Sequence, residues 1–136
     1  MPMIELRRTY RFCASHRLFR PEWDDAENLR GFGPASNPGG HGHNFRVTVV
    51  LVGEPDPRTG RVADLDAVDR IVDATVIEPF DHRNLNLDVA TLEGKVPTAE
   101  MVALEIWRRL EGAFAPARLV EVSLQQDEFL TATVRK

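Results

Sequence analysis

Three histidines have types and spacing that suit a metal ion. His41 and His43 are two residues apart in a stretch that alternates like a strand, so their side chains point the same way. His16 ends the preceding alternating stretch, and antiparallel pairing of the two strands would bring it beside His41. Three imidazole nitrogens can bind zinc at about 2.0–2.1 Å and leave a fourth position open, as in catalytic zinc sites. The sequence therefore predicts a Zn²⁺ site at His16, His41 and His43.

Proton transfer needs a further group, and His82 is the remaining histidine of the chain. A histidine side chain can transfer protons near neutrality, and the adjacent Asp81 can orient this one. Cys13 is the single cysteine, which excludes an intrachain disulfide. It has the opposite strand parity from His16, so we expect it to point away from the metal and to be inert.

The elements that position these residues follow from hydrophobic periodicity. Residues 4–16 and 41–53 alternate apolar and polar side chains, which predicts two half-buried strands. Residues 17–40 are polar and rich in turn formers, which predicts a long loop. A first helix is expected from Asp64 or Asp66 toward Ile77, with Pro79 ending it.

A second helix is expected after Thr98, which is a candidate N-cap, with Glu100 in its first turn. Its apolar face is predicted to be formed by Ala103, Ile106, Trp107, Leu110 and Phe114. Residues 120–134 read as a hairpin. The order β-β-α-α-β-β predicts one α+β domain over residues 1–136, with a four-stranded antiparallel sheet and both helices on one face.

The composition and the net charge limit the classes of partner that we expect for this chain. The chain has 136 residues, 43% of them hydrophobic, and a formal net charge of −4 with scattered basic residues. Nucleic acid is therefore not expected as a partner, because phosphate binding needs a concentrated basic face. No membrane partner is expected either, since no signal peptide or apolar span is visible, and a cytoplasmic location is the expectation.

Five motifs together carry a family resemblance. They are Phe12-Cys13-Ala14-Ser15-His16-Arg17-Leu18, His41-Gly42-His43-Asn44-Phe45, Gly53-Glu54-Pro55-Asp56-Pro57, Asp81-His82-Arg83-Asn84-Leu85 and Pro97-Thr98-Ala99-Glu100. In this order the chain resembles the 6-pyruvoyl-tetrahydropterin synthase family, which includes the 6-carboxy-tetrahydropterin synthases. The resemblance implies the tunnelling fold, in which subunits join edge to edge into a barrel. It implies a homo-oligomer, a trimer or a hexamer, with active sites between subunits.

The resemblance also implies the roles of individual residues. The three histidines would bind the zinc, which holds the hydroxyls of a dihydropterin side chain. A cysteine would take a proton with help from residues that match His82 and Asp81. A glutamate near the C-terminus would hold the pterin ring, and Thr98 and Glu100 are expected to contact the substrate.

This sequence departs from the family pattern at two positions. Ala35 matches the catalytic cysteine and cannot move a proton, while the neighbouring Ser36 is a far weaker base that would need help from His82. Gln126 matches the pterin-binding glutamate but has only one acceptor oxygen. The pterin would then bind more weakly or present a different edge, or Asp127 or Glu128 would replace the glutamate.

Three hypotheses follow. The first is a zinc-dependent lyase acting on a dihydroneopterin-type substrate, with aldolase-like cleavage of the side chain because the thiol is missing. The second is a non-catalytic homologue that binds zinc and a pterin or purine. The third is a structural zinc in an interaction protein, against which the open fourth metal position argues. The substrate, the product and the pathway stay open at this point.

Overall fold

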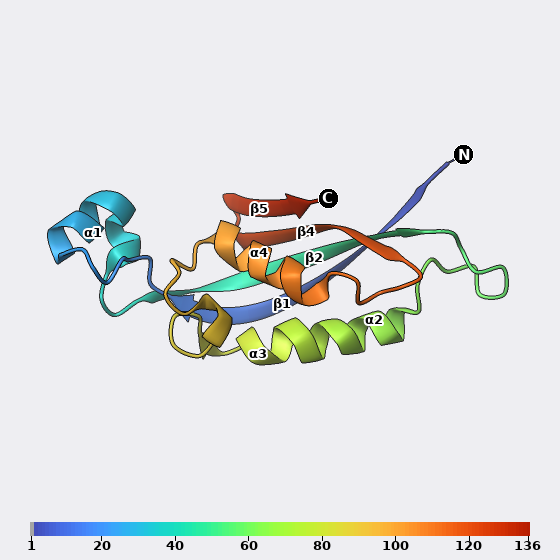
Figure 1. Cartoon of the computed structure of the whole chain (residues 1–136), viewed down its shortest axis with the longest axis horizontal. Coiled ribbons are helices and arrows are strands. Elements are labelled where there is room, and N and C mark those ends of the chain that lie inside the picture. Colours follow the sequence, from blue (N-terminus) through green and yellow to red (C-terminus); the bar gives the residue numbers. More distant parts are fainter. Residues whose placement is uncertain (1) are drawn as a thin grey trace.

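A twisted sheet forms the centre of the protein (Figure 1). The structure, a computed structural model, describes residues 2–136. Strand β1 (Ile4–His16) pairs antiparallel with β2 (His41–Gly53) over its whole length, from Ile4 opposite Gly53 to His16 opposite His41. Strand β2 pairs with β4 (Arg118–Asp127), and β4 pairs with β5 (Leu130–Arg135) in the predicted hairpin.

The sheet has five strands, so the prediction of four antiparallel strands was wrong. The additional strand, β3 (Arg83–Asn84), pairs parallel with Ala14 and Ser15 of β1, which gives the order β3-β1-β2-β4-β5. A strand of two residues has no alternation to detect in a sequence. It matters for the site because it attaches the segment after Asp81 and His82 to the edge of β1.

Helices cover one face of the sheet, as predicted. Figure 1 shows α2 (Leu65–Val72) and α4 (Ala99–Leu110) running across this face, with α3 (Glu78–Phe80) continuing from α2. Asp64 caps α2 and Thr98 caps α4 through their side chains. Apolar residues of these helices and of the sheet form one core, which includes Phe12, Phe45, Val47, Val72, Phe80, Ile106 and Leu124. Phe114 is buried as predicted but lies beyond the end of α4.

Pro79 does not end the first helix. A π-helical turn, η2 (Asp73–Ile77), joins α2 to α3, and the helix continues to Phe80. Proline lacks the N–H that would donate to the carbonyl four residues earlier, that of Thr75. Arg109 of α4 donates to this carbonyl instead (Nη1 to O, 3.1 Å), so a tertiary contact replaces the missing helical hydrogen bond.

The predicted loop between β1 and β2 contains helical structure, so this prediction was wrong as well. It holds α1 (Asp25–Phe32) and the short 3₁₀ helix η1 (Gly33–Ser36), and Figure 1 shows α1 standing apart from the sheet. The N-cap carboxylate of Asp24 accepts from the Glu27 N–H (2.8 Å). An eight-residue polar helix has too little periodicity to outweigh turn formers in a sequence. A further 3₁₀ turn, η3 (Ala90–Leu92), precedes α4. None of the helices within residues 2–136 combines the length and the apolar character needed to cross a membrane.

Candidate functional site

The three predicted metal ligands converge at one end of the sheet. The β1–β2 register sets His16 opposite His41 and Ala14 opposite His43, on the face that carries Phe45 and the core. The ring centroids lie 4.6 Å apart for His16 and His41, 5.1 Å for His16 and His43, and 4.9 Å for His41 and His43. One ring nitrogen from each histidine lies within 4.8 Å of the others, so the three could hold a metal ion.

The hydrogen bonds and burial of these rings fit a metal. His16 is buried, and its Nδ1–H donates to the carbonyl of Pro97 (2.8 Å), which leaves the lone pair on Nε2. The Nε2 atoms of His16 and His43 are both buried without a hydrogen-bond partner. Buried polar atoms in native proteins nearly always have a partner, and a bound cation would supply one to both atoms.

Burial also sets the charge of the rings. The pKa of His16 is lowered to about 4, mainly by desolvation and to a smaller extent by the nearby His41 and His43, while the hydrogen bond to Pro97 acts in the opposite direction. Burial is the main cause that lowers the pKa of His43 as well, followed by His41. Near pH 7 these two imidazoles are therefore neutral, which is the form that binds metal.

Asp81 and His82 form a second polar group at the edge of β1. Asp81 Oδ2 lies 2.9 Å from His82 Nδ1, and Asp81 Oδ1 accepts from the Cys13 N–H (2.8 Å). The hydrogen bond from Cys13 and the contact with His82 hold the pKa of Asp81 below its usual range. His82 has a φ of 60°, a region that side-chain-bearing residues adopt infrequently, and its side chain is 81% exposed. An ionised Asp81 thus orients an exposed imidazole, whose Nε2 is left free to take a proton.

Within one chain this pair is separate from the histidine cluster. His82 donates its backbone N–H to the Cys13 carbonyl (2.5 Å). Cys13 lies three residues before His16 on β1, and three residues span about 10 Å along a strand. The residues grouped as possible metal ligands are His16, His41 and His43, without His82. Cys13 is exposed and also lies outside that group, in agreement with its predicted parity.

The segment with Ala35 and Ser36 lies close to His16 in space. The Leu18 N–H donates to the Ala35 carbonyl (3.0 Å), and Arg17 Nε donates to the Ser36 carbonyl (2.8 Å). Ser36 is buried, and its hydroxyl donates to the Gly33 carbonyl (2.8 Å). Its hydroxyl therefore already has a structural partner, which disfavours Ser36 as a replacement for a thiol.

The three predicted substrate-binding residues occupy different positions. Thr98 caps α4 by accepting from the Met101 N–H (3.2 Å), directly after the Pro97 carbonyl that holds His16. Glu100 is exposed in the first turn of α4. Gln126 is half-buried and lies at an irregularity in the pairing of β4 with β5. Gln125 pairs with Thr131 and Asp127 pairs with Leu130, whereas Gln126 has no partner residue on β5. A bulge of this kind re-aims a side chain. Substrate contacts of all three stay predictions.

The Asp127 side chain stabilises the hairpin turn between β4 and β5. Its Oδ1 accepts from the Phe129 N–H (2.8 Å) and the Leu130 N–H (3.0 Å). It is therefore a weaker substitute for the missing glutamate than the sequence suggests.

Sequence reasoning missed the residues that orient the site through the backbone. The Pro97 carbonyl fixes the His16 ring, whereas in the sequence Pro97 is distinguished only as part of a motif. Asn86 holds the backbone of Arg17 on both sides, accepting from its N–H (2.8 Å) and donating to its carbonyl (2.9 Å). A backbone carbonyl has no residue-type signature, so no signal for Pro97 exists in a single sequence.

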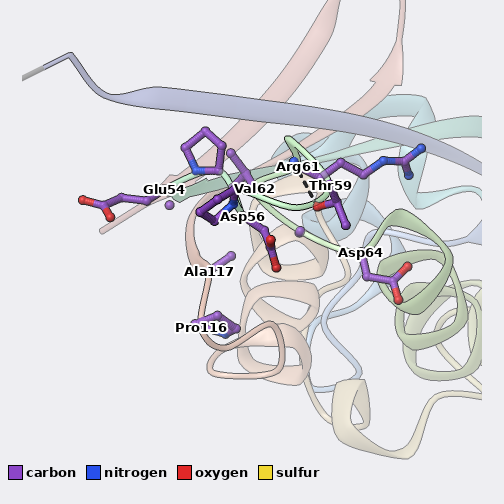
Figure 2. A pocket seen from close by; sticks show the side chains of 12 residues that line it. Glu54, Asp56, Thr59, Arg61, Val62, Asp64, Pro116 and Ala117 are labelled. Carbon is purple, nitrogen blue, oxygen red and sulfur yellow. Dashed lines mark hydrogen bonds between the residues drawn. The ribbon is translucent and has the colours of Figure 1, made fainter.

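A pocket of about 990 Å³ lies at the opposite end of the sheet (Figure 2). It is lined by the loop after Gly53 together with Pro116 and Ala117. Gly53 and His41 are the two ends of β2, twelve residues or about 40 Å apart, so the pocket is far from the histidine cluster. Two of its acidic side chains have structural partners. Asp56 accepts from the Arg58 N–H (2.7 Å), and Asp64 caps α2. None of the predicted site residues lines this pocket.

Comparison with known proteins gives one consistent answer. The family model described as 6-pyruvoyl tetrahydropterin synthase matches residues 5–136. The chain is 40% identical over 124 residues to the 6-pyruvoyl tetrahydrobiopterin synthase of Pongo abelii, covering 91% of this chain and 86% of that protein. It is 38% identical to the enzyme of Homo sapiens with the same coverage. The solved structure of Caenorhabditis elegans 6-pyruvoyl tetrahydropterin synthase matches with a TM-score of 0.92 and 34% identity, covering 100% of this chain and 97% of that one.

The lowered pKa of His16 predicts how the stability of the metal-free protein depends on pH. Between the ordinary value of 6.5 and about 4, the unfolded chain binds more protons than the folded chain, so acid favours unfolding. We expect the free energy of unfolding to fall by an amount on the order of 3 kcal/mol across this window. Urea unfolding of chelator-treated protein at several pH values measures this. The slope should flatten in His16→Gln and persist in His82→Gln, and equal slopes in wild type and His16→Gln would contradict the assignment.

Proposed function

The chain belongs to the 6-pyruvoyl tetrahydropterin synthase family, and on this basis we propose that it is a zinc-dependent lyase acting on a dihydroneopterin-type substrate. The main support is the pair of buried, unpartnered Nε2 atoms of His16 and His43. With His16 held by Pro97, these atoms and His41 form a donor set of three nitrogens that suits zinc. Three protein ligands leave room for a substrate oxygen.

Each of the predicted site residues would have a separate role in this reaction. His16, His41 and His43 would hold the ion, which as a Lewis acid lowers the cost of negative charge on oxygen. His82, oriented by Asp81, would accept the proton of a side-chain hydroxyl at Nε2. Thr98, Glu100 and Gln126 are proposed to position the pterin, with Gln126 in place of the usual carboxylate.

Ala35 favours cleavage of the side chain over the usual family reaction. An alanine cannot take a proton from carbon, and Ser36 is engaged with Gly33, so the proton acceptor that remains is His82. When a side-chain hydroxyl loses its proton to His82, its carbon becomes a carbonyl and the adjacent carbon–carbon bond breaks. The electron pair passes to the carbon on the pterin side, which then takes a proton. This sequence of steps is an aldolase-like cleavage and needs no oxidant.

The separation of His82 from the histidine cluster supports an oligomeric active site. We propose that Asp81 and His82 of one subunit face the metal ligands of another, in a trimer or hexamer closed through the sheet edges. In the part of the chain that the structure describes, β5 pairs only with β4, and β3 covers just two residues of β1, so both sheet edges have open backbone groups. Edge pairing between subunits would satisfy them.

A non-catalytic homologue that binds zinc and a pterin or purine is the second candidate. Ala35 and Gln126 favour it, because both replace groups on which the usual reaction depends. The contact between Asp81 and His82 disfavours it, since binding alone needs no oriented imidazole held in an unfavourable backbone conformation.

Product analysis by mass spectrometry tests the proposed reaction. We expect zinc-loaded protein to convert dihydroneopterin, or its triphosphate, to a pterin with a shortened side chain. Replacing His82 by Ala should lower turnover by about 100-fold or more while the pterin still binds, because a general base contributes about 10²–10⁴-fold.

The control is Arg108→Ala, which changes an exposed residue of α4 and should leave turnover unchanged. If neither substrate changes while zinc and pterin are bound, the lyase is refuted and the binding homologue is favoured. Turnover that survives His82→Ala would remove His82 as the base.

Restoring the thiol should restore the usual family reaction. In Ala35→Cys we expect the product that keeps its full side chain to increase by about tenfold or more relative to the cleavage product, because a thiolate is a far better proton acceptor than a methyl group. Ala35→Ser serves as the matched control of similar size. An unchanged product ratio in Ala35→Cys would show that Ala35 does not determine the reaction.

A further inference from the structure

The sheet face opposite the helices carries a pair of arginines in direct opposition. Arg11 of β1 and Arg46 of β2 are cross-strand partners, and both are exposed. Opposed residues of an antiparallel pair have Cβ atoms about 4.5–5.5 Å apart, and like charges in this position destabilise a sheet. This pair therefore has an energetic cost that a partner of opposite charge would remove.

Two other arginines of this face, Arg7 and Arg135, have acidic partners. Arg7 lies 3.3 Å from Glu5 and 3.1 Å from Glu121, and Arg135 Nε donates to Glu121 (2.6 Å). Among residues 2–136, by contrast, neither Arg11 nor Arg46 makes an ion pair or a side-chain hydrogen bond. The carboxylates of this face are thus used elsewhere, and the opposed pair has none.

The neighbours of the pair are neutral and polar. Thr9 and Thr48, the next opposed residues on this face, have hydroxyls 2.8 Å apart, and Gln125 of β4 lies opposite Arg46. On the other side, Cys13 is opposite Asn44. The result is a local positive charge flanked by hydroxyl and amide groups, in a chain whose net charge is −4.

We propose that Arg11 and Arg46 form a binding site for a phosphate-bearing anion on this face of the sheet. A guanidinium matches phosphate oxygens with paired N–H donors, and two guanidinium groups side by side suit an anion with at least two negative charges. A single carboxylate would neutralise only one of them, so a diphosphate or a longer phosphate chain fits better. The site lies on the opposite face from the metal ligands and does not depend on the reaction proposed above.

Calorimetric titration with inorganic pyrophosphate tests the site. We expect one pyrophosphate to bind per arginine pair in the wild type, and binding to weaken by about tenfold or more in Arg11→Gln and in Arg46→Gln, because each change removes charge-assisted hydrogen bonds. The matched control Arg108→Gln removes an exposed arginine from α4 and should bind as the wild type does. All variants keep the three metal-binding histidines, so chelation by pyrophosphate affects them equally. A parallel titration with adenosine triphosphate separates free diphosphate from a phosphate chain carried on a larger molecule.

Thermal unfolding provides a second readout that a merely structural arginine would not give. At low ionic strength without pyrophosphate, Arg11→Gln should unfold at the same or a higher temperature than the wild type, because repulsion is relieved. With pyrophosphate, the wild type should gain stability and Arg11→Gln should not. The proposal is overturned if sodium chloride of matched ionic strength reproduces the gain, if Arg108→Gln loses binding equally, or if the wild type binds no pyrophosphate.

Discussion

The pairing of β1 with β2 is the constraint on which the rest of the site depends. Thirteen residues of each strand pair without interruption, from Ile4 opposite Gly53 to His16 opposite His41. A slip of one residue would turn every side chain of β1 to the other face and separate His16 from its two partners. The buried Phe12 and Phe45 rings, stacked at 4.9 Å beside the histidines, make that slip costly. The same packing that forms the core therefore fixes the geometry of the three histidines.

Strong periodicity explains which parts of the structure the sequence could predict. Alternation over residues 4–16 and 41–53 predicts both strands, and the parity of His16, His41 and His43 predicts their meeting. Short elements and tertiary contacts carry no such signal. Strand β3 has two residues, and the helix passes Pro79 because Arg109, distant in the chain, donates to the Thr75 carbonyl. The hydrogen bond from His16 to Pro97 is equally invisible, because any residue type offers a carbonyl.

Only some of the groups that the family pattern predicts are present in this chain. The cluster of three histidines and the Asp81–His82 contact are both present in this chain, whereas Ala35 and Gln126 stand where the family resemblance predicts a cysteine and a glutamate. Asp81 also accepts a hydrogen bond from the Cys13 N–H, so the Asp81–His82 pair is attached to the strand that ends in His16. This combination is the reason for proposing a change of reaction and not a loss of function.

The central claim is that the three imidazoles bind one zinc ion and leave a position open. Zinc X-ray absorption spectroscopy of protein purified without a histidine tag measures this most directly. We predict about one zinc per chain, with three nitrogen neighbours at about 2.0–2.1 Å and one further light atom. A sulfur neighbour at about 2.3 Å, fewer than three imidazoles, or fully folded protein that takes up no zinc would contradict the account.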